Sequence, residues 1–167
     1  MGSDQVAVIM GVSGTGKSTV GRLLADELAV PYAEADEFHS AANVEKMRSG
    51  TPLTDEDRWP WLDAIGAWAA SRAGLGGVVS CSALKRVYRD RLRAAAPGLV
   101  FVHLSGSREL ITARQSAREG HFMPASLIAS QFDTLEELGA DEAGVVVDVT
   151  PAPEQIASEA AERLRKL

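Results

Sequence analysis

Gly11-Val12-Ser13-Gly14-Thr15-Gly16-Lys17-Ser18 matches the pattern G-x-x-x-x-G-K-[ST] at every fixed position. Glycines in such a loop let the backbone curl so that successive N–H groups point inward at phosphate oxygens, and the following helix adds its positive N-terminus. In this pattern Lys17 reaches the β- and γ-phosphates, and the Ser18 hydroxyl ligates Mg²⁺. We therefore predict a nucleotide-binding loop formed by Gly11, Ser13, Gly14, Thr15, Gly16, Lys17, Ser18 and Thr19.

The residues on either side of this loop support the motif. An apolar run over Gln5–Met10 precedes it and predicts a buried strand. A helix is expected over Lys17–Ala29, because its leucines and Val20 recur on one face. A strand that leads into a glycine-rich loop and then into a helix is the setting in which this motif binds phosphate, so a chance match is disfavoured.

The remaining chain alternates between apolar runs and helical patterns, which is typical of βαβ units and a parallel sheet. Further strands are expected at 31–35, 77–81, 99–104 and 144–149. Helices are expected from Ser40 to about 50, from Pro60 to about 72, over 88–95, after Ser107, and around Ile156–Leu164. We predict one domain over residues 1–167, with the three-layer α/β fold of P-loop kinases: a five-stranded parallel sheet with helices on both faces, and a helical lid.

Composition narrows the class of protein. Apolar residues make up 46% of the chain and charged residues 24%, as in soluble globular proteins. The net charge of −6 disfavours nonspecific binding to nucleic acid, and no apolar run is long enough to span a membrane. The first residues lack the basic region of a signal peptide, and Cys81 as the single cysteine agrees with a reducing cytoplasm. We therefore expect a cytoplasmic protein. Its net charge does not disfavour a small anionic ligand, because a local basic pocket can exist on an acidic protein.

Two acidic residues after the second strand are candidates for chemistry. The chain has no N-K-x-D segment of the kind that reads guanine, and its third strand ends Ser80-Cys81-Ser82, without an Asp to orient Mg²⁺. In an alternating strand Glu34 and Asp36 would point the same way at the carboxyl edge of the sheet, where ligands bind. A carboxylate there can orient Mg²⁺ or accept the proton of an attacking hydroxyl, although a charged run is also typical of a solvated loop.

A series of motifs then resembles the bacterial gluconate kinases, which belong to the small P-loop kinases related to shikimate and nucleoside-monophosphate kinases. The resemblance runs from the P-loop to about Val147. The motifs are Asp36-x-x-His39, Asn43-x-x-Lys46-Met47, Gly50-x-Pro52-Leu53, Asp57-Arg58-x-Pro60-Trp61-Leu62, Cys81-Ser82-Ala83-Leu84-Lys85, Tyr88-Arg89-Asp90, Gly120-His121-Phe122 and Gln131-Phe132-x-Thr134-Leu135-Glu136.

This resemblance implies phosphorylation of gluconate at O6, with ATP and Mg²⁺ as cofactors and a homodimer as the assembly. Asp36 would accept a hydrogen bond from the C6 hydroxyl and act as base or orienter, and Lys17 and Arg118 are the other candidate catalytic residues. Where relatives often have Asp-Gly-Asp, this chain has Glu34-Ala35-Asp36, so the role of Glu34 at Mg²⁺ is left open. The substrate would meet a helical segment at about 39–73. Its pocket would be lined by Asp36, His39, Lys46, Arg58, Ser82, Lys85, Arg118 and His121.

A lid is expected at about 114–135. Arg114 and Arg118 are four apart, so both guanidinium groups would lie on one helix face, although such a face can also be merely solvated. Arg118 is the candidate for contact with the transferring phosphoryl group. Arg114 could share that role or stack on adenine against the loop that contains Pro151. Alternatives to gluconate phosphorylation are a kinase of another small hydroxy acid, such as shikimate, and a nucleotide-binding regulatory module without catalysis.

Overall fold

The computed structural model describes residues 5–12, 14–117 and 125–167. Its strands are β1 (Val6–Met10), β2 (Tyr32–Glu34), β3 (Gly77–Ser80), β4 (Val100–Ser105) and β5 (Gly144–Asp148). All neighbouring strands are parallel, in the order β2-β3-β1-β4-β5. The predicted five-stranded parallel sheet is confirmed, and β1 lies at its centre.

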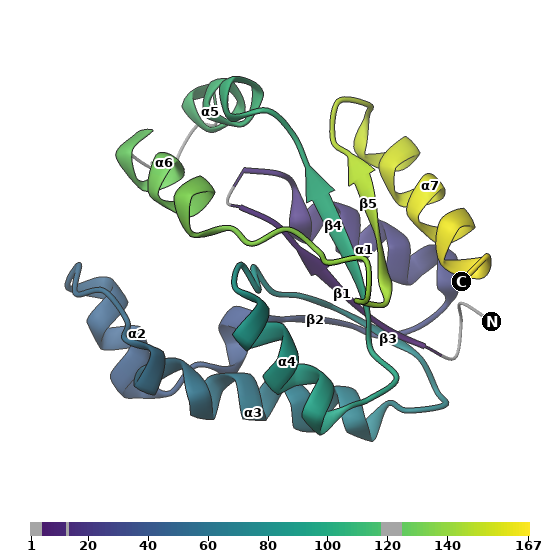
Figure 1. The fold of residues 1–167 in the computed structure, drawn as a ribbon, viewed down its shortest axis with the longest axis horizontal. Coiled ribbons are helices and arrows are strands. Elements are labelled where there is room, and N and C mark those ends of the chain that lie inside the picture. The colour runs from purple at the N-terminus through teal and green to yellow at the C-terminus, as the bar shows by residue number, and fades with distance from the viewer. Residues whose placement is uncertain (1–4, 13, 118–124) are drawn as a thin grey trace.

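Helices cover both faces of this sheet (Figure 1). They are α1 (Lys17–Leu28), the 3-10 helix η2 (Ala35–Phe38), α2 (Ala41–Arg48), α3 (Asp55–Ser71), α4 (Arg86–Ala95), α5 (Arg108–Ala117), α6 (Ala125–Thr134) and α7 (Pro153–Arg165). One face packs against α1 and α7, and the other packs against α3 and α4. Within the part of the chain that is described, no helix is long and apolar enough to cross a bilayer.

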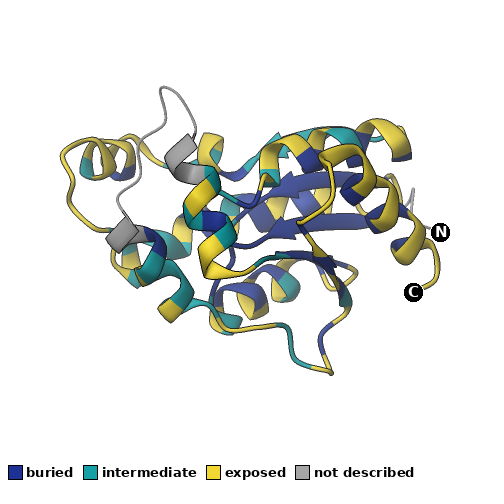
Figure 2. Cartoon of the chain, turned by 90° about the horizontal axis from the view of Figure 1, so that it is seen from above, coloured by how far each residue is buried: buried dark blue, intermediate teal, exposed yellow. Residues whose placement is uncertain are grey.

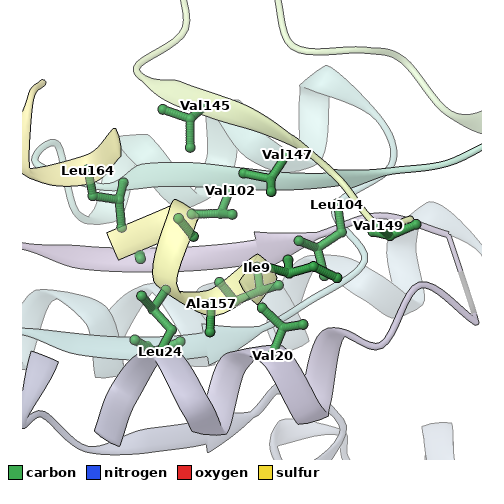
Figure 3. Close-up of a cluster of buried hydrophobic side chains, with 14 of the residues drawn as sticks. Ile9, Val20, Leu24, Val102, Leu104, Val145, Val147, Val149, Ala157 and Leu164 are labelled. Atoms are coloured by element: carbon green, nitrogen blue, oxygen red, sulfur yellow. The ribbon is translucent and has the colours of Figure 1, made fainter. Parts of the chain in front are cut away.

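Alternation along the strands divides the core into two layers. Ile9 of β1 points toward α1 and α7, where it joins Leu24 and Leu164 (Figure 3). Val8 and Met10 point to the opposite face and pack against α3 and α4. Figure 2 shows the buried sheet between helices whose outer faces are exposed. Because both layers are apolar, the carboxyl edge of the sheet is left as the place for polar chemistry.

The start of α3 differs from the prediction. The helix begins at Asp55, one turn before the expected start at Pro60, which lies inside it. A capping box sets this start, because the Thr54 side chain accepts from the Asp57 N–H at 3.2 Å and the Asp57 carboxylate accepts from the Thr54 N–H at 2.9 Å. The earlier start places Asp55 and Arg58 on neighbouring turns of the helix.

The second strand is also shorter than expected. It ends at Glu34, and Asp36 lies in η2. The prediction that Asp36 continues an alternating strand is therefore wrong. The chain turns at Ala35, which is buried and whose carbonyl accepts a 2.7 Å hydrogen bond from the Trp61 indole. Asp36 reaches the carboxyl edge through this turn and is exposed there.

Candidate active site

The glycine-rich loop between β1 and α1 has the backbone that phosphate binding requires. Gly11, Gly14 and Gly16 have φ angles of 147°, 89° and 86°, which residues with a Cβ rarely adopt. A Cβ on Gly11 would also lie 2.8 Å from the Leu104 carbonyl oxygen. Gly11 donates its N–H to the Ser82 carbonyl at 3.2 Å, which ties the loop to the end of β3. Ser13 lies outside the described residues.

The polar side chains of this loop lie at the start of α1. The hydroxyl of Thr15 and the ammonium of Lys17 both donate to the Val12 carbonyl, at 2.9 and 3.0 Å. Ser18 and Thr19 are exposed on the first turn of the helix. Desolvation lowers the pKa of Lys17 to about 8. A nucleotide phosphate would oppose this shift, since a nearby negative charge favours the protonated amine.

Glu34 lies beside this loop at the end of β2. The Tyr32 hydroxyl donates a 2.6 Å hydrogen bond to its Oε1, and the Arg22 guanidinium lies 3.6 Å from the same oxygen. Tyr32 can approach because position 21 is glycine: a Cβ there would lie 2.6 Å from the tyrosine Cε1. The negative charge of Glu34 raises the pKa of Lys17 against the desolvation, so the carboxylate acts on the nucleotide-binding loop.

Asp36 lies on η2, and His39 lies at the end of this short helix. Asp36 is exposed, and its charge raises the pKa of Lys17 and of His39. The His39 ring stacks on Trp61 with 4.2 Å between centroids, and its Nδ1 lies 3.3 Å from the Asn43 amide nitrogen. Desolvation is the main cause of the lowered pKa of His39, so its imidazole is neutral at neutral pH. A neutral His39 can exchange hydrogen bonds with a sugar hydroxyl.

Lys46 is engaged with another side chain. Its ammonium donates to both carboxylate oxygens of Asp57, at 3.0 and 2.9 Å. This contact is the main reason why the pKa of Asp57 is lowered to about 2. Lys46 therefore joins α2 to the capping box of α3, and direct contact with a substrate remains a prediction.

Two further cations share a single carboxylate. Oδ1 of Asp55 accepts a 2.6 Å hydrogen bond from the Tyr88 hydroxyl and lies 3.6 Å from Arg58 and 4.0 Å from Lys85. Both cations also lie over the Tyr88 ring, each 5.6 Å from its centroid. Desolvation, with help from Asp55, raises the pKa of Tyr88 to about 12. The group carries one positive charge in excess, on side chains that are about one-third exposed.

Ser82 lies in the loop between β3 and α4 and is partly exposed. Its carbonyl accepts the Gly11 N–H, so this loop contacts the nucleotide-binding loop directly. Ala83 follows with φ 43°, in the left-handed region, and is buried. Lys85 forms the N-cap of α4 at the end of the same loop. The structure thus brings Ser82 and Lys85 to the carboxyl edge near the phosphate cradle.

A small polar pocket adjoins the cradle on the side of β4. Its volume is about 280 Å³, and it extends from Val12 past the end of β4 to Leu135 and Glu137 after α6. His103 lines it, is 2% exposed, and has no hydrogen-bond partner at Nδ1 in the described structure. The pocket extends the polar surface of the cradle toward the predicted lid.

On the lid side the structure describes one of the two arginines. Arg114 of α5 donates to the Thr150 carbonyl at 3.3 Å, next to Pro151. Thr150 in turn donates from its N–H and hydroxyl to Asp148, at 2.9 and 2.7 Å. Arg114 therefore lies beside the loop that the sequence suggested for adenine. Arg118 and His121 lie outside the residues whose side chains are described.

The donors at this edge fit MgATP. The Ser18 hydroxyl and the Glu34 carboxylate supply the hard oxygen ligands that Mg²⁺ prefers. No group of three His, Cys, Asp or Glu residues that could hold a metal occurs among the described residues. A magnesium ion that keeps waters and binds one or two protein oxygens together with substrate phosphates is consistent with this sparse set.

Three residues of this site were not predicted from the sequence. Tyr32 orients Glu34, and Tyr88 and Asp55 hold the two cations. Tyr88 lies within a quoted family motif, but nothing in its spacing indicates a partner 33 residues earlier. The pattern Thr54-x-x-Asp57 would have revealed the true helix start, and with it the pairing of Asp55 with Arg58.

Comparison with known proteins agrees with the fold. A family model described as an AAA domain matches residues 6–138. The crystal structure of shikimate kinase from Aquifex aeolicus superposes with a TM-score of 0.65, at 17% identity over 97% of each chain. At that identity the likeness concerns the fold alone.

Three closer relatives are gluconokinases. The chain is 43% identical to the thermoresistant gluconokinase of Escherichia coli K12, over 96% of this chain and 94% of that protein. It is 48% identical to the gluconokinase of Gluconobacter oxydans 621H, over 91% of this chain and 86% of that protein. The crystal structure of a gluconokinase from Sinorhizobium meliloti 1021 superposes with a TM-score of 0.91, at 48% identity, and covers 99% of this chain and 94% of that one. The chain belongs to the gluconokinase family.

Proposed function

We propose that this protein transfers the γ-phosphoryl group of ATP to O6 of gluconate, giving 6-phosphogluconate and ADP. Membership of the gluconokinase family, at 43–48% identity over nearly the whole chain, carries this proposal. The side chains at the carboxyl edge of the sheet support it, because they pair a phosphate cradle with cations and with an exposed carboxylate.

The positive group around Tyr88 suits the carboxylate end of gluconate. Among the described residues, Arg58 and Lys85 share the carboxylate of Asp55, so one positive charge is left for an anionic substrate. The planar fork of Arg58 can bind both oxygens of a carboxylate, and Lys85 can add a point charge. His39, stacked on Trp61, offers a neutral ring to the hydroxyls of the sugar acid.

Asp36 is the proposed partner of the reacting hydroxyl. In the transfer, O6 forms a bond to the γ-phosphorus, the bond to the β–γ bridging oxygen breaks, and ADP leaves with that electron pair. The proton of the hydroxyl passes to Asp36. Lys17 stabilises the charge that spreads over the transferring group, which is the main source of catalysis in phosphoryl transfer.

The nucleotide has a proposed set of contacts of its own. The backbone of the glycine-rich loop would hold the phosphates, and Ser18 and Glu34 would hold Mg²⁺, whose charge would offset that of the phosphates. Arg114 and Pro151 would flank the adenine. Arg118 and His121 are proposed to act from the lid, which would exclude water when it closes.

A coupled ADP-release assay over gluconate, glucose, shikimate and adenosine monophosphate tests the proposal. Gluconate should have the highest kcat/KM, and phosphorus NMR should place the product phosphate on the terminal primary hydroxyl. Glucose lacks the carboxylate and should fall roughly 10- to 150-fold lower, because a charge-assisted contact is lost. Higher kcat/KM for shikimate or the nucleotide would overturn gluconate as the substrate.

The Lys17→Ala variant is the control for that assay. Loss of its charge should lower kcat about 10²-fold or more while the fold persists, because Lys17 is the first residue of α1 and belongs to neither apolar core layer. Activity that survives this change would come from a contaminant or from another site. The family resemblance also implies a homodimer, which light scattering at assay concentrations would test.

A further inference from the structure

A buried arginine lies beneath the loop between β3 and α4. Arg89 of α4 is 0% exposed, and its guanidinium donates to four residues. Two bonds go to the carboxylate of Glu142, at 2.8 and 3.1 Å. Three go to backbone carbonyls: Ala83 at 2.9 Å, Leu84 at 3.3 Å and Glu137 at 3.3 Å. These contacts use every N–H direction of the guanidinium.

The partner carboxylate is charged although its side chain is fully buried. Desolvation favours the protonated form of Glu142, but hydrogen bonds from Arg89, from the Gly139 N–H and from Arg93 lower its pKa to about 2. A buried ion pair of this kind adds little stability compared with apolar side chains of the same volume. Disturbing one partner alone is nevertheless destabilising, because it leaves a buried charge without its counter-ion, so a role in positioning has to be measured apart from stability.

The loop that Arg89 holds has an unfavourable backbone. Ala83 has φ 43° and is buried, and a residue with a Cβ keeps this conformation only when its surroundings impose it. The loop is also tied on two other sides. Ser82 accepts from the Gly11 N–H at 3.2 Å, and Leu84 accepts from the Glu136 N–H at 2.7 Å.

The same pair holds the segment that returns from α6 to β5. Glu137 and Glu142 both belong to that segment, and the Glu136 carboxylate also accepts from the Arg86 N–H at 2.8 Å. One guanidinium thus joins the loop that carries Ser82 and Lys85 to the segment that follows the predicted lid.

We propose that the Arg89–Glu142 pair is a positioning device for substrate binding. It holds the carbonyls of Ala83 and Leu84, and with them the strained backbone at Ala83, so that Lys85, the next residue, faces the sugar acid. Ser82 keeps its separate bond to the Gly11 N–H of the phosphate cradle. This inference rests on the proposed function of the site. Arg89 itself does not contact the substrate. Its loss should weaken the binding of gluconate more than the binding of ATP.

Arg89→Lys keeps the charge but loses the fork. We expect the KM for gluconate to rise about 10- to 100-fold, because small misplacements of binding groups are costly, with the KM for ATP little changed. Arg91→Lys is the matched control: it lies on the same helix, makes an exposed two-bond pair with Asp63, and should leave both constants unchanged. If Arg89→Lys raises the KM for gluconate and the KM for ATP equally, or raises neither, the proposal is overturned.

A rescue separates positioning from general stability. Glycine adopts a positive φ without strain, so Ala83→Gly added to Arg89→Lys should recover part of the KM for gluconate without restoring the lost thermal stability. Recovery that follows thermal stability, or no recovery, would show that Arg89 acts only on folding.

Hydrogen exchange of the wild-type protein tests the same idea without any variant or substrate. The amides of Arg86, Glu136 and Gly139 should open as one unit with a common protection, because the pair joins their segments. Independent opening would contradict the proposal. A wild-type protein that does not phosphorylate gluconate, yet shows this common opening, would overturn the proposed function and leave the positioning device intact.

Discussion

The hydroxyl of Tyr32 donates a 2.6 Å hydrogen bond to Oε1 of Glu34, two residues later on β2. Ser80 Oγ lies 2.7 Å from the same hydroxyl and donates to the Lys17 carbonyl at 3.0 Å. Desolvation, with help from Glu34, raises the pKa of Tyr32 to about 12, so the hydroxyl keeps its proton at neutral pH. Tyr32 therefore fixes the carboxylate that is proposed to orient Mg²⁺.

Tyr32→Phe should weaken the response to magnesium. The ring stays in place, but Glu34 loses its donor, and loss of such a supporting contact typically costs about 10-fold in metal affinity or activity. The Mg²⁺ concentration for half-maximal rate should rise, and Glu34→Gln should raise it further. A magnesium dependence that shifts for Glu34→Gln but not for Tyr32→Phe would show that the hydroxyl does not position the carboxylate.

Asp36→Asn should lower kcat on gluconate about 10²-fold, at the lower end of general-base effects, because a loose transition state needs little deprotonation of the nucleophile. The KM for ATP should change little. Glu37→Gln is the matched control, since Glu37 is an exposed neighbour on the same short helix. If kcat survives Asp36→Asn within a few-fold, Asp36 is not the base and Glu34 becomes the candidate.

The sheet and the cradle could be predicted because their signals are local. The glycine-rich motif carries its own geometry, and the alternating apolar runs identify the five strands without knowledge of tertiary contacts. The helix caps at Ser40 and Ser107 are likewise confirmed, since each side chain accepts a nearby backbone N–H.

Partners across the fold could not be predicted in this way. Lys46 is a cation of the kind that binds an anionic substrate, yet its ammonium binds the carboxylate of Asp57, eleven residues away. Arg89 lies in a charged stretch that is typical of a solvated helix, yet it is buried because Glu142 faces it from a distant segment. Charge patterns show that a residue can pair, and only the tertiary structure shows with which partner.

Activity should depend on the protonation of Lys17. Because burial lowers its pKa to about 8, the ammonium is charged below that pH and loses its charge above it. The kcat/KM for ATP at saturating gluconate reports the enzyme–gluconate complex before ATP binds, and it should fall above that pH, by about tenfold per unit. Lys17→Arg stays charged over this range, so its slower reaction should lack the inflection. An inflection that persists in that variant would belong to another group.

Gly21→Ala should destabilise the fold through Tyr32. The added Cβ would lie 2.6 Å from the tyrosine Cε1 and 2.9 Å from Ser80 Oγ, so the ring or the helix must move. Overpacking of this kind costs roughly 1–3 kcal/mol in the free energy of unfolding, measurable by denaturant titration. Gly98→Ala is the control, since a Cβ there meets nothing within 4 Å. Equal effects at both positions would rule out a specific clash.

Lys85→Met should abolish the preference of the enzyme for the charged gluconate over the neutral glucose. In the variant, Arg58 is the one cation that remains beside Asp55, so the two charges balance and the excess positive charge disappears. The methionine keeps an apolar side chain of similar length. The kcat/KM for gluconate should fall roughly 10- to 150-fold, because a charge-assisted contact is lost, and that for glucose should hardly change. Arg91→Met, on the outer face of α4, should leave the ratio of the two substrates unaltered. If Lys85→Met lowers the kcat/KM for gluconate and for glucose equally, Lys85 acts on the phosphoryl group or on the fold. The carboxylate of gluconate must then bind elsewhere.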